Sequence, residues 1–128
     1  MSLIKKASDL RVYKISIELL DPLYKIAYLI PHLGLRTQLI KSGEAIAPLI
    51  SEGFSRQRNP RDAARYYEIA MVESDEVCVH LEKTVVLSKR FTRLPKTKCE
   101  NLISSYNELS KQLNRLRTIW KDYALNKG

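Results

Sequence analysis

Glycine and proline are scarce in this chain, whose 128 residues include only 4 Gly and 5 Pro. An all-β fold with many turns needs more of both, so that class is disfavoured. No run approaches the roughly 20 apolar residues of a membrane-spanning helix. The basic N-terminus meets Asp9 and Arg11 before any apolar run could form a signal peptide. We expect a single domain over residues 1–128, located in the cytoplasm and without a membrane partner.

Residues that form disulfides or bind metals are equally few. Cys78 and Cys99 are the only cysteines, and no CxxC motif is present, which is typical of buried thiols in a reducing compartment. A di-iron centre in a helical bundle uses two Glu-x-x-His motifs. Neither His32 nor His80 has a glutamate three residues before it. Three glutamates could still face inward, and a buried metal site would need them: Glu52, Glu73 and Glu76. We expect no metal and no cofactor, and Glu52 or Glu76 is expected to pair with an arginine within or between subunits instead.

Motifs for catalysis are also missing. The sequence contains no GxSxG, no GxxxxGK[ST] and no GxGxxG. Its serines have no base at a readable spacing, and serines on helices usually bond to the backbone or allow close packing. We therefore expect no catalytic residue and no enzymatic activity.

Helical periodicity is what the chain has in abundance. Apolar and aromatic side chains near the C-terminus alternate at spacings of four and three residues: Leu102, Tyr106, Leu109, Leu113, Leu116, Trp120 and Tyr123. This spacing predicts a helix packed along a narrow seam. Similar patterns predict four helices at about 9–30, 35–56, 60–90 and 95–125. Pro22 either bends the first, which we favour, or stands in the first turn of a new helix capped by Asp21. Pro48 lies inside the second. Short connections between them favour an all-α, up-down-up-down antiparallel four-helix bundle.

Positive charge is in excess, with 22 Lys and Arg against 14 Asp and Glu, a net charge of +8. In the expected bundle, one end collects the basic residues that we take as candidates for binding nucleic acid: Lys5, Lys6, Arg56, Arg58, Arg61, Arg65, Arg117 and Lys121. Arg61 and Arg65 follow a helix N-terminus, where the dipole opposes cations, and this points to an external anion. Aromatic residues nearby could stack on unpaired bases, although packing in the core explains them too.

The opposite end of the expected bundle is also basic. It carries Lys89, Arg90, Arg93, Lys96 and Lys98, and no acid occurs between Lys83 and Lys98. Lys89 and Arg90 lie at a helix C-terminus, where the dipole favours cations. Acidic residues gather in the middle of the third helix, so the molecule is expected to be polarised along its length.

One block of sequence carries a resemblance to a known family. Residues 50–56 read Ile-Ser-Glu-Gly-Phe-Ser-Arg, and Asp9-Leu10-Arg11-Val12-Tyr13 and Ser74-Asp75-Glu76 accompany them. The chain thus resembles the four-helix bundle proteins encoded by 23S rRNA intervening sequences, sometimes labelled ribosomal-protein-like. That family usually has Asn and Ala where Leu49 and Ser51 stand, and Gly-Ser where Glu73-Ser74 stands.

The resemblance implies a left-handed bundle that assembles as a homopentamer. It also suggests kinship with the accessory proteins of diversity-generating retroelements, which bind nucleic acid and a reverse transcriptase. No catalytic residue comes with it. It marks Glu52, Gly53, Arg56, Ser74 and Glu76 as positions for packing and polar contacts between helices, with Arg56 the one expected to meet a ligand.

Two functions follow from the sequence. The first is a non-enzymatic, ring-forming protein that binds nucleic acid, RNA above all, through its basic surface, with a reverse transcriptase or a ribosomal component as a further partner. The alternative is an oligomeric scaffold that binds another protein, in which the charge serves solubility alone. Salt-dependent binding of RNA separates the two.

Overall fold

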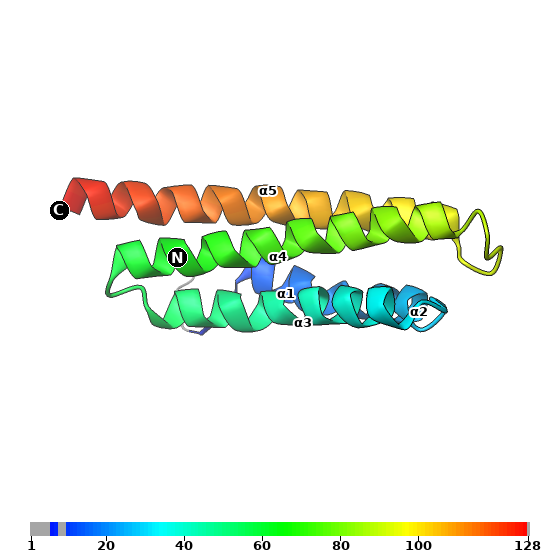
Figure 1. Ribbon diagram of the computed structural model, residues 1–128. Coiled ribbons are helices and arrows are strands. Elements are labelled where there is room, and N and C mark those ends of the chain that lie inside the picture. Colours follow the sequence, from blue (N-terminus) through cyan, green and yellow to red (C-terminus); the bar gives the residue numbers. More distant parts are fainter. Residues whose placement is uncertain (1–5, 8–9, 128) are drawn as a thin grey trace.

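All regular secondary structure is helical in the part of the chain that the computed structural model describes, residues 6–7 and 10–127. The helices are α1 (Arg11–Glu18), α2 (Leu20–Ala27), α3 (Leu33–Ser55), α4 (Pro60–Leu87) and α5 (Lys96–Lys127) (Figure 1). The all-α prediction is confirmed, and α1 and α2 together form the first of the four expected helices. Among these residues, no helix combines the length and the apolar character needed to cross a lipid bilayer.

The first helix is interrupted at a single residue, Leu19. Pro22 has no N–H to donate to the carbonyl of Glu18, so α1 ends there. The backbone of Leu19 still has helical angles (φ −74°, ψ −13°), and its carbonyl accepts from the N–H of Leu23 at 3.1 Å. The proline therefore breaks the hydrogen-bond ladder three residues before itself while the chain continues on a helical course. The expected start at Asp9 lies outside the described residues.

The other boundaries differ from the expected ones by a few residues. α3 begins at Leu33 because the Nδ1 of His32 accepts from the N–H of Leu35 at 3.0 Å and caps the helix. Asn59 caps α4 in the same way, with Pro60 in the first turn as predicted. α4 ends at Leu87 rather than at residue 90, and Pro48 stays inside α3 without ending it.

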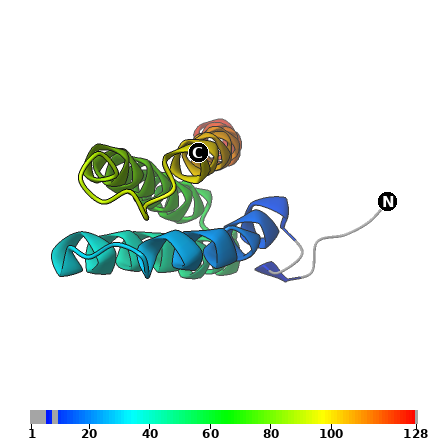
Figure 2. The same ribbon diagram turned by 90° about the vertical axis from the view of Figure 1, so that its right-hand side faces the viewer.

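The helices form two layers, with α4 and α5 in one and α3 with α1 and α2 in the other (Figures 1 and 2). α4 contacts both α3 and α5, and the α1–α2 segment contacts both α3 and α5 in turn. The connection between α3 and α4 lies at the same end as the C-terminus, and the connection between α4 and α5 lies at the other (Figure 1). Each long helix thus has one end near each end of the molecule.

The apolar seam of α5 is buried over only part of its length. Leu102, Tyr106, Leu109 and Leu113 are at most 4% exposed, but Tyr123 is 48% exposed. The C-terminal end of α5 extends beyond the ends of the other helices (Figure 1). The periodicity of the sequence is continuous, whereas the layer that covers it is shorter.

Gly53 brings α3 and α4 into close contact. A Cβ atom on this glycine would lie 2.7 Å from the Cε1 atom of Tyr67, a ring that is fully buried in the core. The hydroxyl of Tyr67 is 3.4 Å from the Nε2 of Gln57, which holds the ring in place. Gly53 is therefore required by packing, as the resemblance implies.

We expect Gly53→Ala to lower the free energy of unfolding by about 1–3 kcal/mol, because the added methyl group overpacks the α3–α4 contact. Urea denaturation measures this change. Ser51→Ala is the control, since Ser51 is an exposed residue on the same helix. That control should stay within about 0.5 kcal/mol of the parent. Equal effects of the two substitutions would contradict the packing role.

His80 is a buried titratable residue on α4. It is 6% exposed, and its Nδ1 atom has no hydrogen-bond partner among the described residues. Burial lowers the pKa of this imidazole, and the charge of Lys83 lowers it further, while Glu76 acts in the opposite direction with an oxygen 3.8 Å from Nε2. The imidazole is therefore held neutral in the folded protein at neutral pH.

Acidification should therefore destabilise the fold through His80. The unfolded chain takes up a proton near pH 6.5, whereas the folded chain does so only at lower pH, so below about 6.5 the unfolded state binds more protons. Stability is complete above that pH and falls as pH drops toward the folded pKa. Urea denaturation at pH 7.5 and 5.5 should show a smaller loss for His80→Gln than for the parent chain. An identical loss in both would show that other groups cause it.

Candidate nucleic-acid interface

A basic groove lies between the N-terminal half of α4 and the C-terminal part of α5. We call it the α4–α5 groove; its volume is about 550 Å³, and its charged lining residues are Arg61, Asp62, Arg65, Glu68, Arg117 and Lys121. Arg61 and Arg65 are four residues apart on α4, and Arg117 and Lys121 are four apart on α5, so each pair occupies one face of its helix. The structure thus brings together four of the eight candidate residues, two from each wall.

Acidic neighbours neutralise only part of this charge. Arg117 donates from Nη1 to the Oε1 of Glu68 at 3.2 Å and from Nη2 to Asn114 at 3.0 Å. Arg61, Arg65 and Lys121 are exposed, and within the described residues none of their side chains has an ion pair or a hydrogen-bond partner. The groove therefore keeps a surplus of positive charge that faces solvent.

The helix dipole adds to this potential. Arg61 and Arg65 lie in the first two turns of α4, beside the partial positive charge of a helix N-terminus. Their position costs stability instead of adding to it, and Asp62 is the one acid in that first turn. A bound anion would be attracted by the side chains and by the helix end together.

Arg56 lies outside the groove and is engaged locally. Its Nε is 3.3 Å from an oxygen of Glu52, and its Nη1 is 3.9 Å from Asp62. The guanidinium also stacks over the ring of Tyr66, 4.8 Å from the ring centre. The resemblance implies that Arg56 contacts a ligand, but two carboxylates neutralise part of its charge. We therefore expect Arg56 to contribute less to binding than the groove residues.

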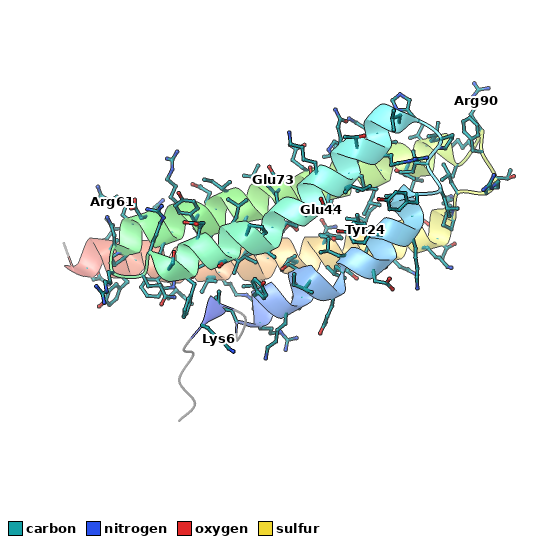
Figure 3. The ribbon with its side chains drawn as sticks, turned by 90° about the horizontal axis from the view of Figure 1, so that it is seen from below. Lys6, Tyr24, Glu44, Arg61, Glu73 and Arg90 are labelled. Atoms are coloured by element: carbon teal, nitrogen blue, oxygen red, sulfur yellow. The ribbon has the colours of Figure 1, made fainter. Side chains whose placement is uncertain are left out.

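The remaining basic candidates are spread around the same end of the molecule. Arg58 is exposed in the connection between α3 and α4. Lys6 is exposed as well and lies on another side of the molecule from Arg61 (Figure 3). Lys5 lies outside the described residues. These residues raise the potential of this end without sharing the groove.

Most of the aromatic residues near these cations pack against the core and are not free to stack on bases. Tyr67 is fully buried, and Phe54 packs against the core. Trp120 is half-buried against the core, and its ring meets that of Tyr123 edge-on at 5.7 Å. The aromatic rings near the cations therefore serve mainly to pack the core, which was the alternative to stacking on bases.

Ser74 joins α4 to α5 by a buried polar contact. Its hydroxyl donates to the backbone carbonyl of Tyr106 at 3.0 Å and accepts from the hydroxyl of Ser110 at 2.8 Å. One turn further along α4, the thiol of Cys78 lies 3.2 Å from the Oδ1 of Asn107. Sequence reasoning missed Ser110 and Asn107. The only available signal was that each directly follows a residue of the apolar seam of α5.

The other family positions make short-range contacts. Glu52 pairs with Arg56, and Glu76 lies beside His80, both at i,i+4 spacing on one helix. A contact between helices that sequence reasoning missed joins α2 to α3, where the hydroxyl of Tyr24 donates to Glu44 at 2.6 Å. That hydrogen bond is the main cause that raises the pKa of Tyr24 to about 12, with burial adding to it.

The groups that could act as nucleophiles are held in inactive forms. Burial raises the pKa of both Cys78 and Cys99 to about 11, so both thiols are protonated at neutral pH. Within residues 6–7 and 10–127, no three His, Cys, Asp or Glu side chains gather in a way that could hold a metal ion. What the groove offers a ligand is positive charge and guanidinium hydrogen bonds.

A comparison with protein families gives one match. A family model described as 23S rRNA-intervening sequence protein matches residues 8–115 of the chain. No curated protein and no solved structure matches it. The match covers α1 to α4 and most of α5, and it ends just before Arg117 and Lys121 on the second wall of the groove.

Proposed function

Since this chain belongs to the 23S rRNA-intervening sequence protein family, we propose that it binds RNA through the α4–α5 groove without catalysing a reaction. The family description refers to ribosomal RNA and names no activity. The function therefore has to be argued from the groove itself.

The observation that carries the proposal is the convergence of four cations on one groove from two different helices. Guanidinium groups bind phosphate oxygens through two parallel hydrogen bonds, which makes arginine well suited to a sugar–phosphate backbone. Arg61, Arg65 and Lys121 have no acidic partner in the described residues, so they need not break an ion pair in order to bind. The net charge of +8 adds long-range attraction at low salt.

The positions of the histidines and thiols support a non-catalytic role. His32 caps α3, and His80 is buried in α4. Burial keeps both cysteine thiols protonated. These histidine and cysteine side chains thus serve the fold, and none of them lines the α4–α5 groove.

We further propose that the protomer is an up-down-up-down antiparallel bundle and that it assembles as a homopentamer. The positions of the connections at opposite ends support the topology (Figure 1). An exposed apolar stripe on α4 supports assembly, because Val72, Val79 and Val86 are 47%, 43% and 64% exposed at seven-residue spacing. This spacing places them on one helical face, as in a seam that packs against another helix.

We make three further proposals that rest on the resemblance. They are kinship with the accessory proteins of diversity-generating retroelements, a reverse transcriptase or ribosomal component as partner, and a cytoplasmic location. The second candidate function, an oligomeric scaffold for another protein, is favoured by the same exposed valines on α4.

RNA binding should weaken when a cation is removed from the groove and tighten when an acid is removed from it. We expect Arg61→Ala with Arg65→Ala to weaken binding of a fluorescein-labelled 20-nucleotide single strand, and to reduce the slope of log K against log salt by about 1.4, or 0.7 per lost phosphate contact. Glu68→Gln should tighten binding, because it removes a negative charge from the groove and releases Arg117. Fluorescence anisotropy over a series of salt concentrations measures both effects.

Lys41→Ala with Thr37→Ala on α3 serves as the control, since both residues are exposed and lie away from the groove. The control should change the slope by much less than the groove pair. The proposal fails if the parent chain retains no RNA at low salt, or if groove and control variants bind alike. Either result would leave the scaffold as the better reading.

Assembly gives a separate prediction. Light scattering at micromolar concentration should return about 74 kDa, five copies of the 14.8 kDa chain. Val72→Asp with Val79→Asp should lower that mass, because charged side chains would have to be desolvated at the seam. Thr37→Asp, on an exposed position of α3, should leave it unchanged. A parent chain that stays at the mass of one protomer would contradict the pentamer.

A further inference from the structure

The end of the molecule opposite the groove carries a second basic surface. We call it the connection surface; it consists of the exposed cations in the connection between α4 and α5 and in the first turn of α5, namely Lys89, Arg90, Arg93, Lys96 and Lys98. Within the described residues, none of the five side chains has an ion pair or a hydrogen-bond partner. All of their charge therefore faces solvent.

Helix dipoles explain only part of this arrangement. Lys89 and Arg90 follow the C-terminus of α4, where the dipole stabilises cations. Lys96 and Lys98 begin α5, whose first turn has no acid, and there the dipole opposes them. The chain reversal brings both helix ends together, so five like charges crowd into ten residues. An external polyanion would relieve this repulsion.

The connection surface is held in place by the fold. Leu94 is 3% exposed and anchors the connection in the core. Successive backbone hydrogen bonds link Arg90 to Leu87 at 3.0 Å, Phe91 to Leu87 at 3.1 Å and Leu94 to Phe91 at 3.0 Å. The cations are therefore presented from a chain with defined turns.

An aromatic ring lies among these cations. Phe91 is 46% exposed although Leu94, three residues later, is buried. An exposed ring among basic side chains suits an unpaired base, which stacks on the ring while the cations bind the phosphates. Beside the connection, an apolar hollow of about 390 Å³ opens between α2 and α5, with Leu29, Pro95 and Lys98 in its lining. These features favour single-stranded or looped RNA over a duplex, whose bases are stacked within the helix.

The two basic ends are separated by acidic residues. α4 has 28 residues, so at about 1.5 Å per residue its ends lie roughly 42 Å apart. Figure 3 shows Arg61 and Arg90 toward opposite ends, with Glu44 and Glu73 between them. A single RNA strand that ran along the protomer from one end to the other would pass these carboxylates, which repel its phosphates. The two ends are thus placed to contact separate segments of RNA.

We propose that the connection surface is a second RNA-binding site, independent of the α4–α5 groove, so that each protomer holds two segments of single-stranded RNA. This inference rests on the proposed function, because it takes RNA as the polyanion. It adds a site at the other end and a preference for unpaired bases.

Stoichiometry tests this inference whatever the oligomeric state. At low salt, and at protein concentrations far above the dissociation constant, a labelled 8-nucleotide oligouridine should bind two per protomer. Arg90→Ala with Arg93→Ala should reduce this to one, and so should Arg61→Ala with Arg65→Ala. The four substitutions together should abolish binding. Lys41→Ala with Lys111→Ala, at exposed positions of α3 and α5, should still bind two.

The outcomes separate the two sites. If the Arg61/Arg65 pair lowers the stoichiometry while the Arg90/Arg93 pair matches the control, the connection surface does not bind RNA and the groove still does. If the parent chain binds no oligouridine, the proposed function fails as well. Light-induced crosslinking of 4-thiouridine RNA, mapped by mass spectrometry, should mark Phe91 in the parent chain and in the groove variant. Its absence from both would overturn the second site.

Discussion

The register between α4 and α5 is the constraint on which the rest of the structure depends. Ser74 sets it, because its buried hydroxyl bonds at once to the carbonyl of Tyr106 and to Ser110. A shift of one turn would leave buried polar groups without partners, at a cost of about 1–3 kcal/mol for each. Two turns away from this contact, the same register brings Glu68 within 3.2 Å of Arg117. The groove is therefore a consequence of a polar contact in the core.

That register also determines where charge is neutralised. The acids of α4 are concentrated in its middle, and one of them already pairs with an arginine of α5. At both ends of the α4–α5 layer the cations extend beyond these acids, so they face solvent. The positions of Arg61, Glu73 and Arg90 in Figure 3 thus follow from the sequence of α4 and its connection to α5, in which the acids lie mostly in the middle of the helix and the cations lie near its ends.

Much of the fold could be predicted from the sequence because its signals are local. Seven-residue spacing marks the helices, and Asn59-Pro60 marks the start of α4. The break at Leu19 also follows from local chemistry. Pro22 has no N–H to donate to the carbonyl of Glu18, four residues before it, so the helix is interrupted there and not at the proline itself. The exposure of Tyr123 could not be predicted, because the spacing along one helix does not tell which of its turns other helices cover.

The candidate site was predictable only as a set of charges. Sequence alone groups Arg56 with Arg61 and Arg65 because they are close along the chain. The structure distinguishes them, because Tyr66 and Asp62 engage Arg56, which does not line the groove. Conversely, Arg117 is more than fifty residues from Arg65 and joins it only through packing. No local pattern contains that information.

The second wall of the groove lies beyond the part of the chain that the family model matches. That match ends at residue 115, whereas Arg117 and Lys121 come later on the same helix. The match therefore covers the chain segment that forms the α4 wall, but it does not reach the cations that face that wall. Since two cations on one helix would form only a charged stripe, the groove exists because α5 continues past the matched region. RNA binding at this site is thus an inference from the geometry of this chain, and it would stand or fall with the residues of α5 even if the family had another role.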